Sequence, residues 1–257
     1  MMMTMRPWRI RGLEIVPVIA VCLASSANAQ APKEQQGFKN LQILPKDIAR
    51  PELIQTMRSV SGALGVRCVF CHVGEEGKPM DTWDFAADDK PEKKIARTMM
   101  QMTTELNSKW VSQLKSADHT PPQIACATCH HGKSSPRSLQ DVLGTTVDEK
   151  GVTAAVSQYR ELRDKYYGRD AYDFGEPPLN ILADKLSNQK KNADAITLLE
   201  LNAEFNPKSA TVQGMLGSAY QESGAKDKAI AAYKKALELN PNFEPAKRKL
   251  AELQGGK

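Results

Sequence analysis

Two copies of the pattern Cys-x-x-Cys-His constrain this 257-residue chain more than any other feature. They lie at residues 68–72 and 126–130 and hold four of the five cysteines, the fifth being Cys22. Two thiols three positions apart can form thioethers with one porphyrin, and the histidine that follows can then ligate its iron as the proximal ligand. The sequence therefore predicts two covalently bound haem c groups.

The predicted haem-binding residues are the two thiols and the histidine of each motif. They are Cys68, Cys71 and His72 in the first motif and Cys126, Cys129 and His130 in the second. A structural zinc site competes with this interpretation, but its cysteine pairs are usually separated by about 15 to 20 residues, far fewer than lie between these two motifs. Disulfides or thioredoxin-like pairs also compete, but they need no histidine after the second cysteine, and no βαβ pattern surrounds either motif.

The first thirty residues favour export. Arg6, Arg9 and Arg11 precede an apolar run over residues 15–24, which is followed by Ala27-Asn28-Ala29. This pattern is typical of a secretory signal peptide over residues 1–29. The apolar run has about ten residues, whereas a bilayer span needs roughly twenty. We therefore expect a periplasmic protein, either free or associated with a membrane.

Composition excludes some classes of function. With 41% hydrophobic and 25% charged residues the chain is an ordinary globular protein, and 6% aromatic residues favours helices over a β-sandwich. Loss of the signal peptide would lower the formal net charge from +5 to +3. Spread over the whole chain, this charge is no nucleic-acid-binding signature.

A helix is predicted immediately before the first motif. Pro51 suits its first turn, and Gly65 is placed to end it. Its apolar face consists of Leu53, Met57, Val60 and Leu64. The chain then turns back along the helix with a porphyrin between, so Met57 can face the iron opposite His72.

A second helix is predicted to run to about Leu114. Asp89 and Glu92 are spaced as a capping box, with Pro91 in the first turn. One stripe of this helix carries Ile95, Met99, Met102 and Leu106. The connection before Cys126 is long enough for the second motif to face either Met99 or Met102. The pattern does not choose between them, and His119 is a third candidate for the distal ligand.

Several segments around the two motifs carry a family resemblance. They are residues 40–44, 65–68 and 96–103, and Asn107 and Trp110 before residues 126–130. Together, over residues 38–136, they resemble the cytochrome c subunit of bacterial photosynthetic reaction centres. The resemblance implies Met57 and Met99 as distal iron ligands, and electron donor and acceptor proteins, or a membrane complex, as partners. The family usually has four haems, and Gln113 stands here where its second helix offers a histidine to a further haem.

The C-terminal third contains a 34-residue repeat. Pro207 and Pro241 are 34 residues apart, as are Ala195 and Ala229. This period resembles the tetratricopeptide repeat, whose helix pairs present a concave surface to partners. We expect residues 152–167 to form a helix before the repeats and residues 245–254 to cap them. The repeats are expected to bind a protein or peptide partner, or else to brace the haem domain.

These expectations combine into a mainly α protein with little regular sheet: a multihaem c-type cytochrome domain followed by a tetratricopeptide-like hairpin stack. The expected divisions are a signal peptide (1–29), a dihaem cytochrome c domain (30–145), a linker with a helix (146–175) and repeats with a capping helix (176–257). We expect an electron-transfer protein that is not an enzyme, because iron with both axial positions filled is suited to carry electrons. A dihaem peroxidase with one open haem site and a haem-containing interaction scaffold stay open as alternatives.

Overall fold

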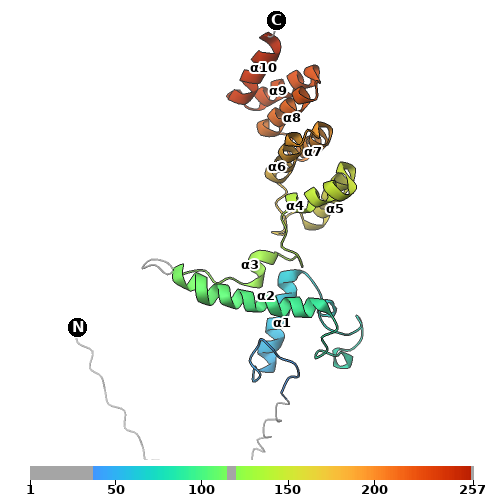
Figure 1. The fold of residues 1–257 in the computed structure, drawn as a ribbon, viewed down its shortest axis with the longest axis vertical. Coiled ribbons are helices and arrows are strands. Elements are labelled where there is room, and N and C mark those ends of the chain that lie inside the picture. The colour runs from blue at the N-terminus through green and yellow to red at the C-terminus, as the bar shows by residue number, and fades with distance from the viewer. Residues whose placement is uncertain (1–36, 115–119, 256–257) are drawn as a thin grey trace, which may run out of the picture. The chain divides into compact units, whose positions relative to one another are not determined.

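The regular structure of the protein is helical, which confirms the predicted mainly α fold (Figure 1). The computed structural model describes residues 37–114 and 120–255. The expected signal peptide, Cys22 and the candidate ligand His119 lie outside these residues. Within them, β-type pairing consists of one isolated antiparallel bridge between Val73 and Asp84.

Residues 37–138, called the haem region below, contain the two motifs. The region begins with α1 (Arg50–Leu64), η1 (Cys68–Phe70) and η2 (Met80–Thr82). Then come α2 (Pro91–Glu105), a π-helical turn η3 (Leu106–Trp110), a 3-10 turn η4 (Val111–Leu114) and the short helix α3 (Cys126–His130). Both motifs are thus preceded by a helix, as predicted.

Helix α1 ends where its sequence predicts. Gly65 adopts φ 65° and ψ 30°, the left-handed conformation that glycine enters without steric cost. The N–H of Val66 donates to the carbonyl of Ser61 at 3.0 Å, which closes the last turn. This turn reverses the chain into the first motif.

Helix α2 begins one residue later than predicted, and the predicted capping box is wrong. Its N-cap is Lys90, whose side chain makes no capping hydrogen bond, and Pro91 is the first helical residue. Asp89 therefore lies one position too early to cap the helix with Glu92. Beyond Glu105 the chain stays helical with altered pitch to Leu114, which is the predicted end.

Residues 139–255, called the repeat region below, consist of helices packed in pairs. They are α4 (Leu139–Lys150), α5 (Val152–Tyr166), α6 (Glu176–Asn188), α7 (Asn192–Phe205), α8 (Ala210–Glu222), α9 (Lys226–Leu239) and α10 (Glu244–Gly255). Figure 1 shows them as successive hairpins, and α10 packs on α9 as the expected capping helix. Gly217 lets α8 and α9 approach closely, because a Cβ there would lie 2.5 Å from the ring of Tyr233.

Helix α4 is not among the helices predicted from the sequence. Ser138 caps it by accepting the N–H of Asp141 at 3.2 Å, and Leu139, Leu143 and Val147 follow on one buried face. This spacing of i, i+4 and i+8 is a helix signal that could have been found. The helix runs through the expected boundary at residue 145, and the division of the chain into domains stays a prediction.

Over the described ranges, none of the helices combines the length and the apolar character that a membrane span requires.

Candidate haem sites

The first motif folds into a tight turn that gathers its three functional side chains. The N–H groups of Cys71 and His72 donate to the carbonyl of Cys68 at 3.2 and 2.9 Å. Both thiols are free, with Cys68 exposed and Cys71 half-buried. Burial, with a smaller effect from Glu92, raises the pKa of the Cys71 thiol. The turn presents two thiols and an imidazole from five consecutive residues.

His72 packs against one aromatic side chain of a later loop, and a second aromatic side chain stacks on the first. The Phe85 ring lies 5.0 Å from the imidazole, and Trp83 stacks on Phe85 at 5.7 Å and 26°. Burial, followed by the positive charge of Lys93, lowers the pKa of His72. The neutral imidazole that results is the form that ligates metals. Its buried Nδ1 has no hydrogen-bond partner among the described residues.

The second motif forms α3 and holds its histidine differently. His130 is buried, and its Nδ1 lies 2.8 Å from the carbonyl oxygen of Lys133. Because a carbonyl can only accept, Nδ1 carries the proton and Nε2 is left for a metal. The N–H of Ala125 donates to Thr128 Oγ1 at 3.0 Å, which stabilises the start of α3. His131 is exposed, with φ 48°.

Asn107 fixes the approach to the second motif. Its Nδ2 donates to the carbonyl of Ile124 at 2.7 Å, and its Oδ1 accepts the N–H of the same residue at 2.8 Å. Ile124 stands two positions before Cys126, so one side chain of η3 holds the returning chain beside the second helix. From the sequence alone, Asn107 stands out only as part of the family resemblance.

The two motifs are joined by a backbone contact. The N–H of Gly132, just after the second motif, donates to the carbonyl of Ala63 at 2.8 Å. A Cβ on Gly65, just before the first motif, would lie 2.1 Å from the Gly132 carbonyl oxygen. Gly65 therefore requires a bare backbone at this contact, whereas a Cβ on Gly132 would meet nothing, and the contact holds the end of α1 against the second site.

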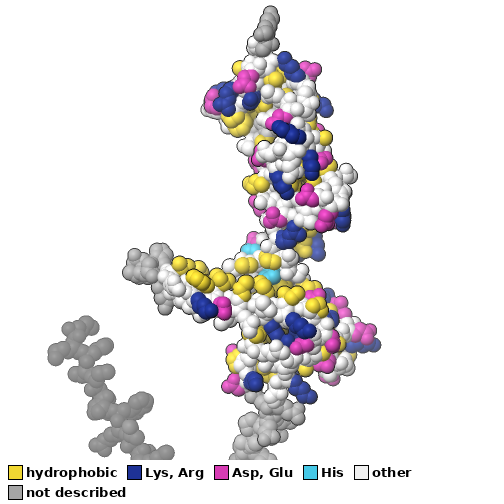
Figure 2. All heavy atoms as spheres, in the orientation of Figure 1, with side chains coloured by type: hydrophobic (Ala, Val, Ile, Leu, Met, Phe, Trp, Pro, Cys, Tyr) yellow, Lys and Arg dark blue, Asp and Glu magenta, His cyan; other side chains and the backbone are white. Residues whose placement is uncertain are grey.

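The expected methionine ligands lie on helices that expose apolar side chains. Met57 on α1 and Met99 on α2 are half-buried, whereas Met102 is 42% exposed. Figure 2 shows hydrophobic side chains exposed along α2. On α2 and its continuation they include Ile95, Met102, Trp110 and Leu114. No distance decides between Met99 and Met102, and each methionine ligand stays a prediction.

The residues present fit two haem c groups. Each motif offers two free thiols and an imidazole that burial or a hydrogen bond holds, and apolar side chains nearby stand uncovered. In residues 37–114 and 120–255, no three His, Cys, Asp or Glu side chains are grouped to hold one metal ion, so the two cysteine pairs do not form a joint zinc-type site.

Comparison with known proteins gives the same interpretation for the first two thirds of the chain. The family model described as "Photosynthetic reaction centre cytochrome C subunit" matches residues 14–167. The cytochrome c subunit of the reaction centre from Thermochromatium tepidum is 28% identical over 131 residues, which are 50% of this chain and 29% of that protein. Cytochrome c-554 of Chloroflexus aurantiacus is 33% identical over 81 residues, or 32% of this chain and 17% of that protein. The chain thus spans less than a third of the length of either relative.

The repeat region has its own matches. A family model described as "Tetratricopeptide repeat" matches residues 210–243. The crystal structure of MamA is 23% identical, with a TM-score of 0.33, over 46% of this chain and 66% of that one.

The match to the reaction centre model covers more than half of the 257 residues and both Cys-x-x-Cys-His motifs. The chain therefore belongs to the photosynthetic reaction centre cytochrome c subunit family, with a tetratricopeptide repeat near its C-terminus.

Proposed function

We propose that the protein is an exported dihaem c-type cytochrome that passes single electrons between redox partners. Its family makes it a c-type cytochrome; the number of haems, the ligands, the location and the partners are the proposal. The observation that supports it most is that both motifs are built alike. Each has two free thiols and an imidazole that is held in place, by the Phe85 ring at His72 and by the Lys133 carbonyl at His130. Bound haem iron supplies one-electron chemistry by cycling between its ferric and ferrous states.

The chain's own residues bind and orient the two groups. Cys68 and Cys71 would form the thioethers of the first, and Cys126 and Cys129 those of the second. His72 and His130 would ligate the irons, each supported from behind, by the Phe85 ring and by the Lys133 carbonyl respectively. Met57 and Met99 would fill the opposite positions.

A haem count and a mass measurement on the exported protein test the proposal. A pyridine haemochrome spectrum should give two haems per chain, and the mass should equal residues 30–257 plus two haem groups. The residue pattern of positions 1–29 supports cleavage after Ala29. One haem, no haem, or zinc in the purified protein would overturn the dihaem assignment.

Methionine variants test the ligands. Met57→Ala should remove the six-coordinate low-spin spectrum of the first haem and leave that of the second intact. Met99→Ala should do the reverse. Met80→Ala is the matched control, because Met80 is 56% exposed at η2. If Met102→Ala, and not Met99→Ala, changes the second haem, then Met102 is the ligand.

The peroxidase alternative differs in one spectral property. An enzyme of that class keeps one haem open for peroxide, so the unmodified protein would show a high-spin haem. A wholly low-spin spectrum supports the carrier.

We also propose that the repeats bind a protein partner in electron transfer. A groove between α6 and α8 supports this, since Pro177, Ile181, Thr211 and Met215 line it and Ile181 is 53% exposed. Ile181→Glu should slow electron exchange with membranes of the source organism and leave reduction by dithionite unchanged. Equal rates for the variant and the unmodified protein would argue against this role.

A further inference from the structure

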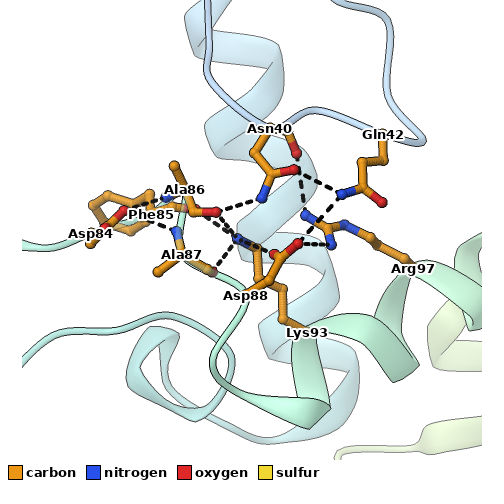
Figure 3. Close-up of polar contacts among 9 residues, drawn as sticks. All are labelled: Asn40, Gln42, Asp84, Phe85, Ala86, Ala87, Asp88, Lys93 and Arg97. Carbon is orange, nitrogen blue, oxygen red and sulfur yellow. Dashed lines mark hydrogen bonds and ion pairs between the residues drawn. The ribbon is translucent and has the colours of Figure 1, made fainter.

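A buried lysine lies at the centre of a polar cluster behind the first motif (Figure 3). Lys93 stands in the first turn of α2 and is only 8% exposed. Its ammonium group donates to three consecutive carbonyls, those of Phe85, Ala86 and Ala87, at 2.9, 3.1 and 2.6 Å. It also pairs with Asp88 Oδ1 at 3.0 Å. The loop 85–88 is therefore wrapped around a single cation.

The cluster extends to a second cation and to a second carboxylate, Asp84, whose Oδ1 accepts the N–H groups of Ala86 and Ala87 at 2.9 Å each. Asp88 accepts from Arg97 Nη1 at 2.8 Å, and Arg97 Nη2 donates to the carbonyl of Asn40 at 3.2 Å. Hydrogen bonds from Arg97, Asn40 and Lys93 hold the pKa of Asp88 well below its usual range. Two carboxylates thus stand beside two cations, but after burial the charges that act most strongly on His72 are cations, Lys93 first and then Arg97 and Lys90, and each of them lowers the pKa of this histidine.

This cluster holds the loop that backs His72. At its start, the N–H of Asp84 donates to the carbonyl of Val73, next to His72, at 3.0 Å. At its end, Lys93 holds three carbonyls in place. Phe85 lies between these anchors, with its ring 5.0 Å from the imidazole. A single ammonium group therefore links α2 to the position of the first proximal histidine.

The second motif lacks this arrangement. His130 donates from Nδ1 to the Lys133 carbonyl at 2.8 Å. The backbone of Phe85 lies close enough to His72 to act on its pKa, but His72 Nδ1 makes no hydrogen bond of ordinary length and angle with the described residues. Hydrogen bonding of Nδ1 makes an imidazole a stronger donor to iron, which favours the ferric state. A buried positive charge near the iron favours the ferrous state, because reduction lowers the charge of the iron. Both differences act in the same direction.

We propose that Lys93 is a positioning residue of the first haem site, which holds the loop 85–88 against His72 and sets the first haem at a higher reduction potential than the second. The inference rests on the proposed function, because it requires haem c at both motifs. The proposal concerns the reduction potential of each haem. It predicts that, in the half-reduced protein, the electron resides mainly on the first haem.

The test is a spectroelectrochemical titration of the full-length protein with both haems attached. The potentials are assigned with a Cys126→Ala/Cys129→Ala variant, which retains only the first motif. Lys93→Met removes the charge and keeps the length of the side chain. Asp88→Asn removes the carboxylate charge and makes the cluster more positive. Lys94→Met is the matched control, because Lys94 is the exposed neighbour of Lys93 on α2.

In the unmodified protein the first haem should have the higher potential. Lys93→Met should lower it, so that the ratio of reduced to oxidised first haem falls roughly tenfold at a fixed potential, which corresponds to about 59 mV for one electron. Asp88→Asn should raise it, and Lys94→Met should change neither haem. Lys93→Arg, which keeps the charge, should restore most of the potential even where its larger head disturbs the loop.

Three results would overturn the inference: a higher potential at the second haem, a first-haem potential unmoved by both Lys93→Met and Asp88→Asn, or equal shifts in both haems. If the Lys93→Met variant attaches no haem at the first motif, the Asp88→Asn variant decides: a raised first-haem potential supports the inference, and a lowered or unchanged one overturns it. The haemochrome count made beforehand separates these failures from a failure of the dihaem proposal, since a protein without two haems gives no two potentials to compare.

Discussion

The haem region and the repeat region bury their apolar side chains very differently. In the repeat region one continuous core joins α4 to α9, and residues such as Tyr159, Leu179 and Leu198 are completely buried. Among the described residues of the haem region, the buried apolar side chains are Ile48 and Ala63. The repeat region therefore has a core made of its own side chains, and the haem region does not.

The exposed side chains show the same contrast. Eight large hydrophobic side chains of the haem region are exposed, namely Ile54, Phe70, Met80, Phe85, Ile95, Met102, Trp110 and Leu114. In the repeat region they are Tyr167 and Ile181. Leaving apolar surface exposed to water costs about 25 cal/mol of free energy for each Å². In the haem region the porphyrins would therefore be the core as well as the redox groups.

The largest expected effect comes from preventing haem attachment. Replacing all four motif cysteines with serine should leave residues 37–138 largely unfolded and residues 139–255 folded, because only the second region has its own core. Hydrogen exchange measured by mass spectrometry on the full chain would show this as loss of protection confined to the haem region. Equal protection of both regions would contradict the comparison.

A core substitution in the repeat region should destabilise that region and leave the haem region unchanged. Leu198 is 0% exposed on α7, so Leu198→Ala should cost about 2–5 kcal/mol of unfolding free energy in the repeat region. The haem spectrum should not change. Ile181→Ala on the exposed face of α6 is the control and should cost less than about 0.5 kcal/mol. A change in the haem spectrum of Leu198→Ala would mean that the two regions unfold together.

Gly65→Ala tests the backbone contact that organises the haem region. The new methyl group would meet the Gly132 carbonyl oxygen, and the left-handed φ of 65° adds strain, so we expect a loss of about 1–3 kcal/mol in this region. Gly77→Ala is the control, because Gly77 also has a positive φ, of 86°, but open space around it. Thermal unfolding followed at the haem absorption band should show a larger loss of stability for Gly65→Ala, which adds strain and a steric clash, than for Gly77→Ala, which adds strain alone. Equal losses of stability in the two variants would rule out a role for the contact.

The smallest expected effect is a pH dependence confined to the repeat region. The Tyr220 hydroxyl donates to Glu200 Oε1 at 2.6 Å, and burial, with that bond, raises the pKa of Tyr220 from 10.0 to about 12. The folded protein then keeps the proton longer than the unfolded chain, so the contribution is complete below pH 10 and is lost as the pH rises toward 12. Tyr220→Phe should flatten this part of the repeat region's unfolding profile, whereas Tyr167→Phe, at an exposed site, should not. A Tyr220→Phe profile that falls as steeply as that of the unmodified protein would contradict the prediction.

Local patterns in the sequence predicted the helices well. Helix α1, its end at Gly65 and the 34-residue register of the repeats depend on spacing within a few turns, and the structure confirms them. The start of α2 was placed one residue early, because Asp89 and Lys90 both precede Pro91 and spacing alone does not decide which is the N-cap.

The contacts that shape the candidate sites could not be predicted in this way. Arg97 reaches the backbone of Asn40, 57 positions earlier, and Asn107 reaches Ile124, 17 positions later. Such pairs depend on how the chain returns on itself, which periodicity does not encode. For the same reason the choice between Met99 and Met102 was open from the sequence and stays a prediction.

The contact between Gly65 and Gly132 also bears on the order of maturation. The two glycines are 67 positions apart, so the end of α1 cannot acquire this neighbour until the second motif has been synthesised. We expect the first motif to stay open to the attachment machinery during that interval. A chain that ends before Gly132 should then still take up haem at Cys68 and Cys71, and its failure to do so would mean that the two attachments are coupled from the start.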